Sequence, residues 1–358
     1  MSGYYTTYRV LSLMAGSSAD GVTAALIRYG QSPSTDWTYE LLAGEEWPYP
    51  PSLQEKLQRP LSAQTPEDLL HLSIIYTDWT AACVRRFIAP YACDLIAWHP
   101  HNVFHEPRAG LTWSLGDSER FRVLAGLPIV THFRARDIAT EGTGAPLIPN
   151  ADQLLFSTYE TLINLGGIAN LTHLPSGTAY DITPCNQLLN ALARQVDPSL
   201  PYDDDGQIAA QGRELPDLAE KIESLPFFDL PPPKALDNLT VQQDFILPFL
   251  SYPASPADKL HTAIQVIVRQ LARALTTVGA KTYTLTGGGA FNTFLVKLVA
   301  ERVAPQGIAF IPAPQTLILY REAIGFGLLG LLRWLGLPNT YKRWTGSSRS
   351  HSSGTLSL

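Results

Sequence analysis

Two segments of this chain repeat one pattern: an apolar run, a glycine-rich turn and a second apolar run. The first is LSLMAGSSADGVTAAL at residues 11–26, and the second is INLGGIANLTHL at residues 163–174. Apolar runs that flank a Gly/Ser/Asp turn predict a β-hairpin. At 358 residues the chain is long enough for about two domains. We therefore expect two similar α/β lobes, each containing such a hairpin, that face a central cleft.

Charge and cysteine content argue against several classes of function. The net charge is −6, the pI is near 5.8, and no basic run precedes the C-terminal tail. A duplex-binding protein usually has a clustered basic face, so we expect no nucleic-acid partner. The three cysteines, Cys83, Cys93 and Cys185, are odd in number and lie in no CxxC spacing. This pattern argues against a disulfide framework and against a structural zinc site.

The sequence also lacks the usual signals for secretion and membrane insertion. Its N-terminus does not have the basic start and long apolar run of a signal peptide. The most apolar segment elsewhere, Ala323–Leu337, is shorter than a membrane span of about 20 residues and contains Arg333. We predict a cytoplasmic protein without a membrane partner.

Elsewhere in the sequence, short apolar runs typical of strands alternate with segments whose apolar residues have helical spacing. Strands are predicted at 8–13, 22–28, 94–98, 111–115, 128–132, 161–164, 168–174, 178–182, 282–286 and 308–311. Helices are predicted at 66–89, 118–125, 185–195, 256–278, 293–303 and 321–335. Residues 35–65 are rich in Pro, Trp and Glu and are predicted to be irregular, and the Ser/Arg-rich tail 341–358 to be disordered. The expected lobes are 1–145 with 316–340, and 146–315.

Three glycine-rich turns are candidates for phosphate binding. Glycine lets several backbone N–H groups converge on one phosphate because it has no Cβ. The turns are MAGSSADG at residues 14–21, LGG at 165–167, and LTGGGAFN at 285–292, which lies between a strand and a helix. A helix N-terminus favours anions, although the third turn is neither GxGxxG nor a P-loop. An ordinary hairpin or strand–helix turn remains the alternative for each.

Asp181 is a candidate general base, because YDITPCN places it at the end of a predicted buried strand. The alternative is an Asx turn or a cap for the helix that starts near Cys185. Cys185 itself has no clear His partner, so we interpret it as structural.

Histidines and arginines cluster in the first half. WHPHNVFH contains His99, His101 and His105, which could bind a metal, although their spacing lacks a completing ligand, or could donate to sugar hydroxyls. THFRARD contains Arg134 and Asp137. Arginine suits bidentate recognition of a carboxylate or phosphate, and a surface salt-bridge cluster is the alternative.

Taken in order, eight segments resemble one family, the anhydro-N-acetylmuramic acid kinases of the acetate and sugar kinase/Hsp70/actin superfamily. The resemblance runs from about Tyr8 to Leu337. Its segments are MAGSSADG, GDSERFRVLAGLPIVTHFRARD, GAPLIP, NLGGIANLT, YDITPCN, YDDDGQIAAQG, LTGGGAFN and REA. It implies a two-lobed, actin-like (ribonuclease H-like) α/β fold with a central nucleotide cleft. It also implies a sugar kinase of peptidoglycan recycling that uses ATP and Mg²⁺, and it suggests a homodimer.

In this family, water attacks the anomeric carbon of a 1,6-anhydro sugar while O6 departs toward the γ-phosphorus, giving N-acetylmuramic acid 6-phosphate. The resemblance assigns the base to Asp181. It assigns the sugar, or support of its pocket, to His99, Arg134, Asp137 and Glu322. The carboxylate of Asp20 in the first glycine turn is in addition a candidate ligand for Mg²⁺, through water. The implied nucleotide and phosphate residues are Gly16, Ser17, Ser18, Asp20, Gly21, Gly166, Gly167, Gly287, Gly288, Gly289 and Asn292.

The sequence departs from the family mainly on the sugar side. Pro100 replaces a glycine and removes an N–H donor. Asn102 stands in the same altered motif, and Glu141 and Thr143 alter a glycine/glutamine-type loop. The loop PPPKALDN at 231–238 lacks a family hydroxyl and a glycine but keeps Lys234. Two alternatives therefore stay open: a kinase for a different sugar or anhydro sugar, and a nucleotide-binding pseudo-kinase that acts as a sensor.

Overall fold

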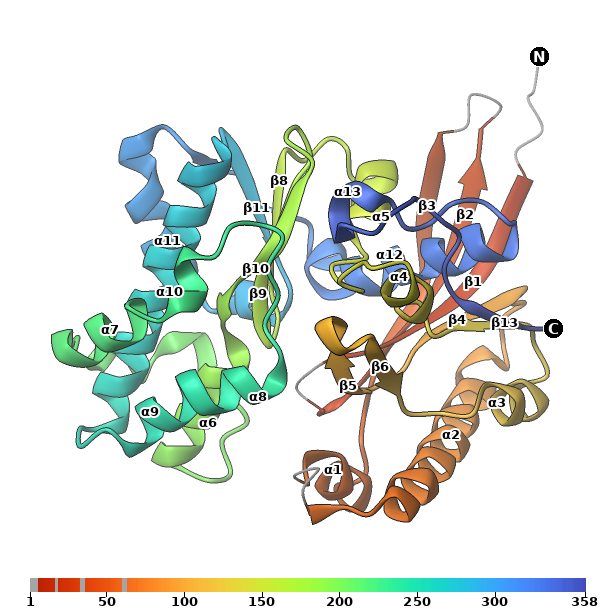
Figure 1. The fold of residues 1–358 in the computed structure, drawn as a ribbon, viewed down its shortest axis with the longest axis horizontal. Coiled ribbons are helices and arrows are strands. Elements are labelled where there is room, and N and C mark those ends of the chain that lie inside the picture. Colours follow the sequence, from red (N-terminus) through yellow and green to blue (C-terminus); the bar gives the residue numbers. More distant parts are fainter. Residues whose placement is uncertain (1–5, 17–18, 33–35, 60–62) are drawn as a thin grey trace. The chain divides into compact units, whose positions relative to one another are not determined.

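The computed structural model describes residues 6–16, 19–32, 36–59 and 63–358. These residues form two compact units. The first comprises the described residues up to Phe156 together with Tyr320–Leu358, and the second is Ser157–Leu319. Each unit has its own sheet and its own hydrophobic core (Figure 1). The boundaries thus fall at 156/157 and 319/320, whereas the sequence predicted 145/146 and 315/316.

The first unit is built on a sheet with the strand order β13-β7-β4-β1-β2-β3. β1 pairs antiparallel with β2 and parallel with β4, while β3 is antiparallel to β2, β7 is parallel to β4, and β13 is antiparallel to β7. A separate hairpin, β5–β6, belongs to the same unit. The strands are β1 (Thr6–Ala15), β2 (Gly21–Gln31), β3 (Trp37–Pro48), β4 (Leu95–His99), β5 (Asn102–Glu106), β6 (Leu111–Ser114), β7 (Ile129–Thr131) and β13 (Thr355–Ser357).

The second unit is built on a sheet with the order β10-β9-β8-β11-β12. β9 is antiparallel to both β8 and β10, whereas β11 is parallel to β8 and to β12. The strands are β8 (Thr161–Leu165), β9 (Ile168–His173), β10 (Thr178–Pro184), β11 (Thr282–Thr286) and β12 (Ala309–Phe310).

The two sheets share one topology. In each, a three-stranded antiparallel meander is extended on the side of its first strand by two parallel strands. This is the strand arrangement of a ribonuclease H-like fold, and its occurrence in both units confirms the predicted actin-like α/β class. Both predicted hairpins are the first two strands of their sheets. The repeat in the sequence therefore reflects a repeat in the fold.

Helices cover both faces of the sheet in the first unit. Leu11, Leu13 and Trp98 point to the face that packs against α1, α2 and α3. On the other face lies α12, where a Cβ on Gly330 would come within 2.5 Å of Ala97 Cβ. Adjacent strand residues alternate between faces, which explains this division. The helices of this unit are α1 (Pro51–Gln58), α2 (Pro66–Ile88), α3 (Ser118–Ala125), α4 (Ala135–Ala139), α5 (Pro149–Leu155) and α13 (Lys342–Thr345), with most of α12 (Gln315–Trp334).

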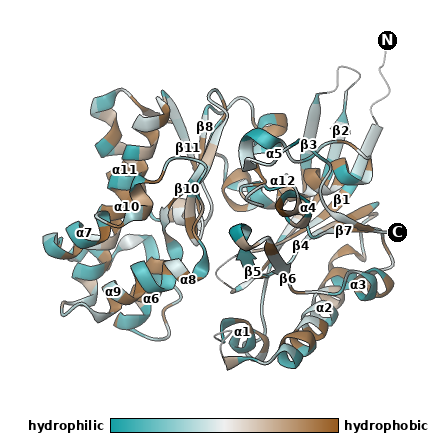
Figure 2. Cartoon of the chain, viewed as in Figure 1, coloured by the Kyte–Doolittle hydropathy of each residue, from teal (hydrophilic) through white to brown (hydrophobic). Residues whose placement is uncertain are grey.

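Local sequence signals explain where the long helices start and stop. Thr65 and Asp68 form a reciprocal capping box at the start of α2. This helix carries both hydrophilic and hydrophobic residues (Figure 2). Ser255 caps the start of α10, and Gly279 ends it with φ = 69°. The second unit contains α6 (Asn186–Val196), α7 (Pro216–Glu223), α8 (Asn238–Thr240), α9 (Leu247–Ser251), α10 (Pro256–Val278) and α11 (Thr293–Val303), with a π-helical turn at Val241–Ile246.

The structure corrects the prediction for residues 35–65. The described part of this segment contains β3 and α1 instead of an irregular excursion. β3 pairs with β2 along its whole length and forms the edge of the sheet, where many of its side chains are exposed. An edge strand can carry many charged residues, which hid its strand character in the sequence.

The C-terminal tail was predicted to be disordered, and this prediction was wrong. It contains α13 and β13, and β13 pairs with β7 in the first unit. His351, Ser353 and Ser357 are buried despite the polar composition. Backbone pairing and buried side-chain hydrogen bonds replace the apolar contacts that composition-based reasoning looks for.

α12 begins at Gln315, six residues before the predicted start of a helix at Arg321. Among the described residues, it is the one helix that is long and apolar enough to span a membrane. This helix begins eight residues before the apolar segment Ala323–Leu337 that the sequence singled out. However, 67% of its most apolar window is buried inside the protein, which is typical of a core helix.

Candidate functional site

In the second unit, two of the predicted phosphate turns lie against each other. They follow β8 and β11, which are parallel neighbours with Thr286 opposite Asn164. A Cβ on Gly287 would lie 2.5 Å from Asn164 Oδ1, and a Cβ on Gly289 would lie 2.8 Å from Leu165 Cβ. Gly287 also has φ = 78°. Glycine is therefore required here for close packing and backbone conformation.

Asn186 joins these two turns. Its Nδ2 donates to the Leu165 carbonyl at 3.0 Å, and its Oδ1 lies 3.1 Å from where a Cβ on Gly289 would be. The backbone N–H groups of Cys185 and Asn186 donate to the carbonyls of Gly167 and Gly166. The hairpin turn is thus fixed to the first turn of α6 through its carbonyl oxygens. Sequence reasoning did not name Asn186 as a site residue, although it stands in the YDITPCN motif.

Asp181 lies on β10, directly before a β-bulge, and its side chain is half-buried. Its Oδ2 accepts a hydrogen bond of 2.9 Å from the Leu236 N–H, and its own N–H donates to the Lys234 carbonyl at 3.0 Å. The residue at the N-cap of α6 is Cys185, with no side-chain cap hydrogen bond. Asp181 therefore does not cap α6, and the loop around residues 234–236 holds its carboxylate.

Lys234 anchors this loop. Its Nζ donates to the carbonyls of Phe227 and Phe228, at 3.0 and 3.2 Å, and lies 4.5 Å from the centroid of the Phe227 ring. Burial lowers the pKa of this amine below its ordinary value. The loop keeps this anchor although it lacks the family hydroxyl, because the lysine binds backbone carbonyls and an aromatic ring rather than loop side chains.

Asn292 has a structural role that the sequence prediction did not include. Its Oδ1 accepts from the Leu295 N–H at 2.9 Å and thereby caps α11. Beside it, Asp205 accepts from the Thr293 N–H at 2.9 Å, and hydrogen bonds from the side chain and the backbone of Thr293 lower the pKa of Asp205. A Cβ on Gly206 would come within 2.6 Å of Asn292 Oδ1. The DDDG segment is thus a packing partner for the third glycine turn.

The remaining predicted phosphate turn belongs to the first unit. Ser17 and Ser18 lie outside the described residues. Gly16 follows the end of β1, and the exposed Asp20 precedes β2, with its carbonyl accepting from the Tyr49 N–H. Gly21 is required by packing, because a Cβ there would lie 2.6 Å from the Trp47 carbonyl oxygen.

His99 and Arg134 meet in a small pocket of the first unit. His99 is buried at the end of β4 and stacks on Phe326 with ring centroids 4.0 Å apart. Arg134 Nη2 lies 3.3 Å from His99 Nε2, and Arg134 Nη1 donates to the Gly144 carbonyl at 2.6 Å. Burial, reinforced by Arg134, lowers the pKa of His99 well below its ordinary value. The pocket is lined by His99, Thr112, Ser114, His132, Phe133, Arg134 and Ala135.

The imidazole of His99 is therefore neutral, and its proton position follows from its neighbour. A guanidinium can only donate, so Nε2 must accept from Arg134, and the proton lies on Nδ1. His99 can thus present one N–H donor, while its acceptor nitrogen is already used.

The other two histidines of WHPHNVFH do not complete a metal site. No group of three or more His, Cys, Asp or Glu side chains suitable for a metal is present in the described part of the chain. The His101 N–H donates to Tyr76 Oη at 3.2 Å, and burial lowers the pKa of its imidazole to about 4. His105 Nδ1 lies 3.5 Å from Thr112 Oγ1.

Asp137 and Glu322 also lie in the first unit. Asp137 is fully buried, and its carboxylate accepts from Gly144 N–H and Thr345 Oγ1, each at 2.7 Å. This geometry fits support of the pocket, since Gly144 is also the residue that holds Arg134. Glu322 is half-buried on α12. The next residue back, Arg321, is buried in a two-pronged ion pair with Asp152, which sequence reasoning did not predict.

The predicted residues therefore gather in separate groups within the units. Gly16, Asp20 and Gly21 lie at one hairpin of the first unit, and His99, Arg134 and Asp137 form a connected group in the same unit. Gly166, Gly167, Gly287–Gly289, Asn292 and Asp181 belong to the second unit. A carboxylate held by a backbone N–H, on a strand that pairs with the second strand of a glycine-turn hairpin, can serve as a general base.

Known proteins match this chain over nearly its whole length. The family model described as anhydro-N-acetylmuramic acid kinase matches residues 8–357. The anhydro-N-acetylmuramic acid kinase of Xylella fastidiosa is 32% identical over 94% of this chain and 93% of its own length. That of Nitrosospira multiformis is 30% identical, over 97% and 98%.

Among solved structures, a ROK family glucokinase from Streptomyces griseus in complex with glucose and AMPPNP is 11% identical. It has a TM-score of 0.42, with 92% of this chain and 99% of that chain covered. The family model matches nearly the whole chain, and the two relatives align with nearly all of it. These two findings decide the classification. This chain belongs to the anhydro-N-acetylmuramic acid kinase family.

Proposed function

We propose that this protein uses ATP and water to open 1,6-anhydro-N-acetylmuramic acid and to phosphorylate O6, which gives N-acetylmuramic acid 6-phosphate for cell-wall recycling. Family membership over residues 8–357 supports the reaction. The observation that carries the mechanism is the position of Asp181, a half-buried carboxylate oriented by the Leu236 N–H on a strand next to the Gly166–Gly167 hairpin.

The chemistry requires a base, because neutral water is a weak nucleophile. Asp181 takes a proton from water as the water oxygen bonds to the anomeric carbon. The bond between that carbon and O6 breaks, and O6 bonds to the γ-phosphorus while ADP leaves. One proton passes to Asp181, and the products are the 6-phosphate and ADP.

The glycine turns bind the nucleotide in this proposal. Gly166, Gly167 and Gly287–Gly289 bring backbone close to the ligand, and Gly16, Asp20 and Gly21, with Ser17 and Ser18, form the other phosphate loop. Mg²⁺ neutralises phosphate charge when bound. The exposed carboxylate of Asp20 fits the oxygen-donor preference of magnesium and its tendency to retain water ligands.

His99 and Arg134 recognise the sugar, supported by Asp137, with Glu322 on α12 as a further sugar-side residue. A neutral His99 offers an N–H to a sugar oxygen, and the Arg134 guanidinium suits the lactyl carboxylate of the substrate. We place the reaction in the cytoplasm, with ATP and a small sugar as partners. A homodimer remains a prediction from the family resemblance, which sedimentation velocity would test.

The decisive experiment is ADP release by the purified protein with 1,6-anhydro-N-acetylmuramic acid, compared with a panel of plain hexoses and other anhydro sugars. With 1,6-anhydro-N-acetylmuramic acid we expect ADP and the 6-phosphate in equal amounts. With the other sugars we expect neither product. Turnover of a plain hexose without turnover of the anhydro sugar would replace the proposed substrate. Tight ATP binding without ADP formation on any sugar would indicate a sensor instead of an enzyme.

A further inference from the structure

The last residues of the chain, Asn339–Ser357, form a folded segment that we call the C-terminal strap. It follows α12 and ends in β13, which pairs with β7, the strand directly before His132 and Arg134. Asn339 Nδ2 donates to the Leu329 carbonyl, which fixes the start of the strap to α12. It also donates to the Ser353 carbonyl, which joins the two ends of the strap. The strap is therefore a fixed part of the first unit.

The strap holds the loop of residues 140–145. The Thr143 N–H donates to the Thr345 carbonyl at 2.9 Å, and the Ser348 N–H donates to the Thr140 carbonyl at 2.8 Å. Thr143 Oγ1 also lies 3.1 Å from the Thr345 carbonyl oxygen. Backbone bonds thus tie this loop to the strap at Thr140 and at Thr143.

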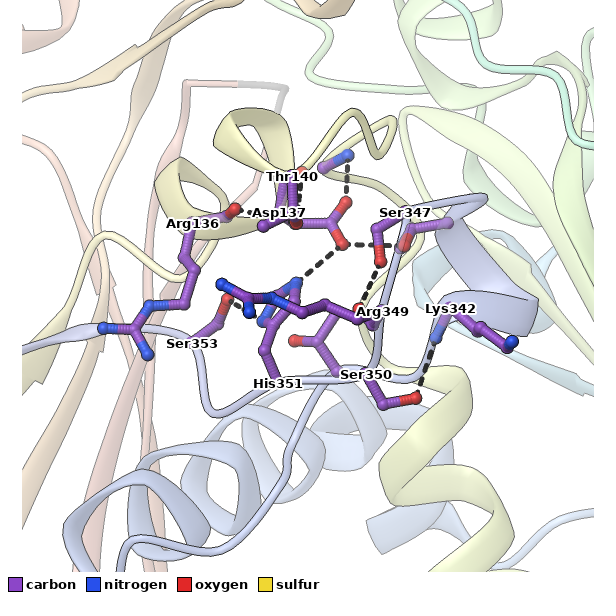
Figure 3. Close-up of polar contacts among 12 residues, drawn as sticks. Arg136, Asp137, Thr140, Lys342, Ser347, Arg349, Ser350, His351 and Ser353 are labelled. Carbon is purple, nitrogen blue, oxygen red and sulfur yellow. Dashed lines mark hydrogen bonds and ion pairs between the residues drawn. The ribbon is translucent and has the colours of Figure 1, made fainter.

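Asp137 is the centre of the same contact. Figure 3 shows its carboxylate pointing toward His351 of the strap, whose Nε2 lies 3.2 Å from Asp137 Oδ1. Thr345 Oγ1 donates to the same oxygen at 2.7 Å. Asp137 Oδ2 accepts from the Gly144 N–H at 2.7 Å, and a Cβ on Gly142 would collide with this carboxylate. One buried carboxylate therefore links the strap to the loop.

The connection continues into the pocket. The Gly144 carbonyl accepts from Arg134 Nη1 at 2.6 Å, and Arg134 Nη2 donates to His99 Nε2 at 3.3 Å. Both Arg134 and His99 line the pocket. An unbroken series of hydrogen bonds thus runs from His351 through Asp137, Gly144 and Arg134 to His99, and all of its members belong to the first unit.

His351 acts as a neutral donor in this series. Burial lowers the pKa of His351, although Asp137 opposes this shift. Nε2–H then donates to Asp137, and Nδ1 accepts from Ser353 Oγ at 3.1 Å. Asp137, His351 and Ser353 are connected like a hydrolase triad, but Ser353 is fully buried and no substrate can reach it. The arrangement therefore orients Asp137 and does not provide a nucleophile.

We propose that the C-terminal strap is a positioning element for the pocket, in which His351 and Thr345 fix Asp137 and thereby set the 140–145 loop and the Arg134–His99 pair. The strap residues touch neither substrate in this proposal and act through Asp137. The proposal rests on the proposed function only where it identifies the pocket ligand as the sugar.

The test compares His351→Leu with His351→Gln, which keeps an amide donor near the position of Nε2, and adds Thr345→Val. We expect His351→Leu and Thr345→Val to raise the KM for the anhydro sugar about tenfold, because misplaced binding groups lose affinity steeply. The KM for ATP should stay within about twofold. His351→Gln should restore most of the sugar KM. Amide hydrogen exchange in residues 140–145 should be faster in the Leu variant than in the Gln variant.

Ser350→Ala is the matched control, because the hydrogen bond that Ser350 Oγ accepts from the Lys342 N–H joins two residues of the strap itself. We expect the control to match the wild type in sugar KM and in exchange at 140–145. Unchanged sugar KM and unchanged exchange in His351→Leu and Thr345→Val would overturn the proposal, even if the melting temperature fell. If the wild-type protein does not turn over the anhydro sugar, the proposed function fails, and the exchange rates alone decide on the strap.

Discussion

At the scale of the residue, the position of one carboxylate depends on a loop far along the chain. The Leu236 N–H that orients Asp181 comes from a residue 55 positions later. Because a backbone donor holds one oxygen, the carboxylate has a defined direction. In the proposed mechanism, β10 and the 234–236 loop therefore set the direction of the base.

Asp181→Asn tests the base. We expect turnover of the anhydro sugar to fall by a factor of about 10² or more, because the amide cannot accept the proton from water. Calorimetry should show ATP affinity close to that of the wild type. Asp244→Asn, at an exposed position of the same unit, is the control and should retain full activity. Wild-type turnover in Asp181→Asn would remove this residue from the role of base.

Lys234→Met tests the loop that positions the base. The variant keeps the length of the side chain but loses the hydrogen bonds to the carbonyls of Phe227 and Phe228. We expect kcat to fall about tenfold with little change in the KM for ATP, because Asp181 loses its fixed orientation. Lys221→Met, on the exposed side of α7, should leave kcat unchanged. An equal effect of both variants would contradict this role of Lys234.

At the scale of the element, the two glycine turns of the second unit are packed together rather than merely adjacent. Parallel pairing of β8 and β11 brings their ends to the same edge of the sheet, and Asn186 at the start of α6 bonds to the Leu165 carbonyl. The two turns therefore lie together because the register of two strands, separated by more than 100 residues, aligns them.

Gly289→Ala tests this packing. The added Cβ would meet Leu165 Cβ at 2.8 Å and the Leu165 carbonyl oxygen at 3.0 Å, so the backbone must move. We expect a loss of stability of about 1–3 kcal/mol in chemical denaturation, as is usual for overpacking. Gly288→Ala is the comparison, because the nearest atom to its Cβ would be 3.8 Å away. A similar loss in both variants would show that the clash is relieved elsewhere.

Several elements were predictable from the sequence because their signals are local. α10 and α11 have the predicted bounds, and each begins at a side-chain cap, Ser255 and Asn292 respectively. β3 and β13 were missed because both lie at sheet edges and depend on a partner strand. The pairing of Asp137 with His351 was missed because 214 residues separate them.

At the scale of the whole molecule, the fold disfavours the charged form of several histidines of the first unit. Burial lowers the pKa of His99, His101 and His132, in the case of His101 to about 4. Arg134, His105 and His132 also disfavour a charge on His99. Protonation of these rings is easier in the unfolded chain, so acid favours unfolding.

The stability should therefore be fully present above about pH 6.5, the unfolded histidine pKa, and should decline as the pH falls from 6.5 toward 4. Each such histidine contributes a slope of up to about 1.4 kcal/mol per pH unit in that window. Urea unfolding at several pH values should show a smaller slope in His101→Gln than in the wild type. His71→Gln, at an exposed position, provides the control for the substitution itself, and an equally reduced slope in both variants would contradict the role of His101.

The sequence by itself determined the α/β class, the repeated hairpin and the family, because hydrophobic periodicity, turn glycines and ordered motifs are written along the chain. The tertiary structure decided what holds each motif. In the fold, the Leu236 N–H binds the Asp181 carboxylate, and Asn186 lies between the two glycine turns. His351 of the C-terminal strap binds the Asp137 carboxylate. Such contacts depend on strand register and on burial of polar groups. Neither is a local property, since a hydrogen bond between distant residues exists only when the fold brings both groups together and excludes water.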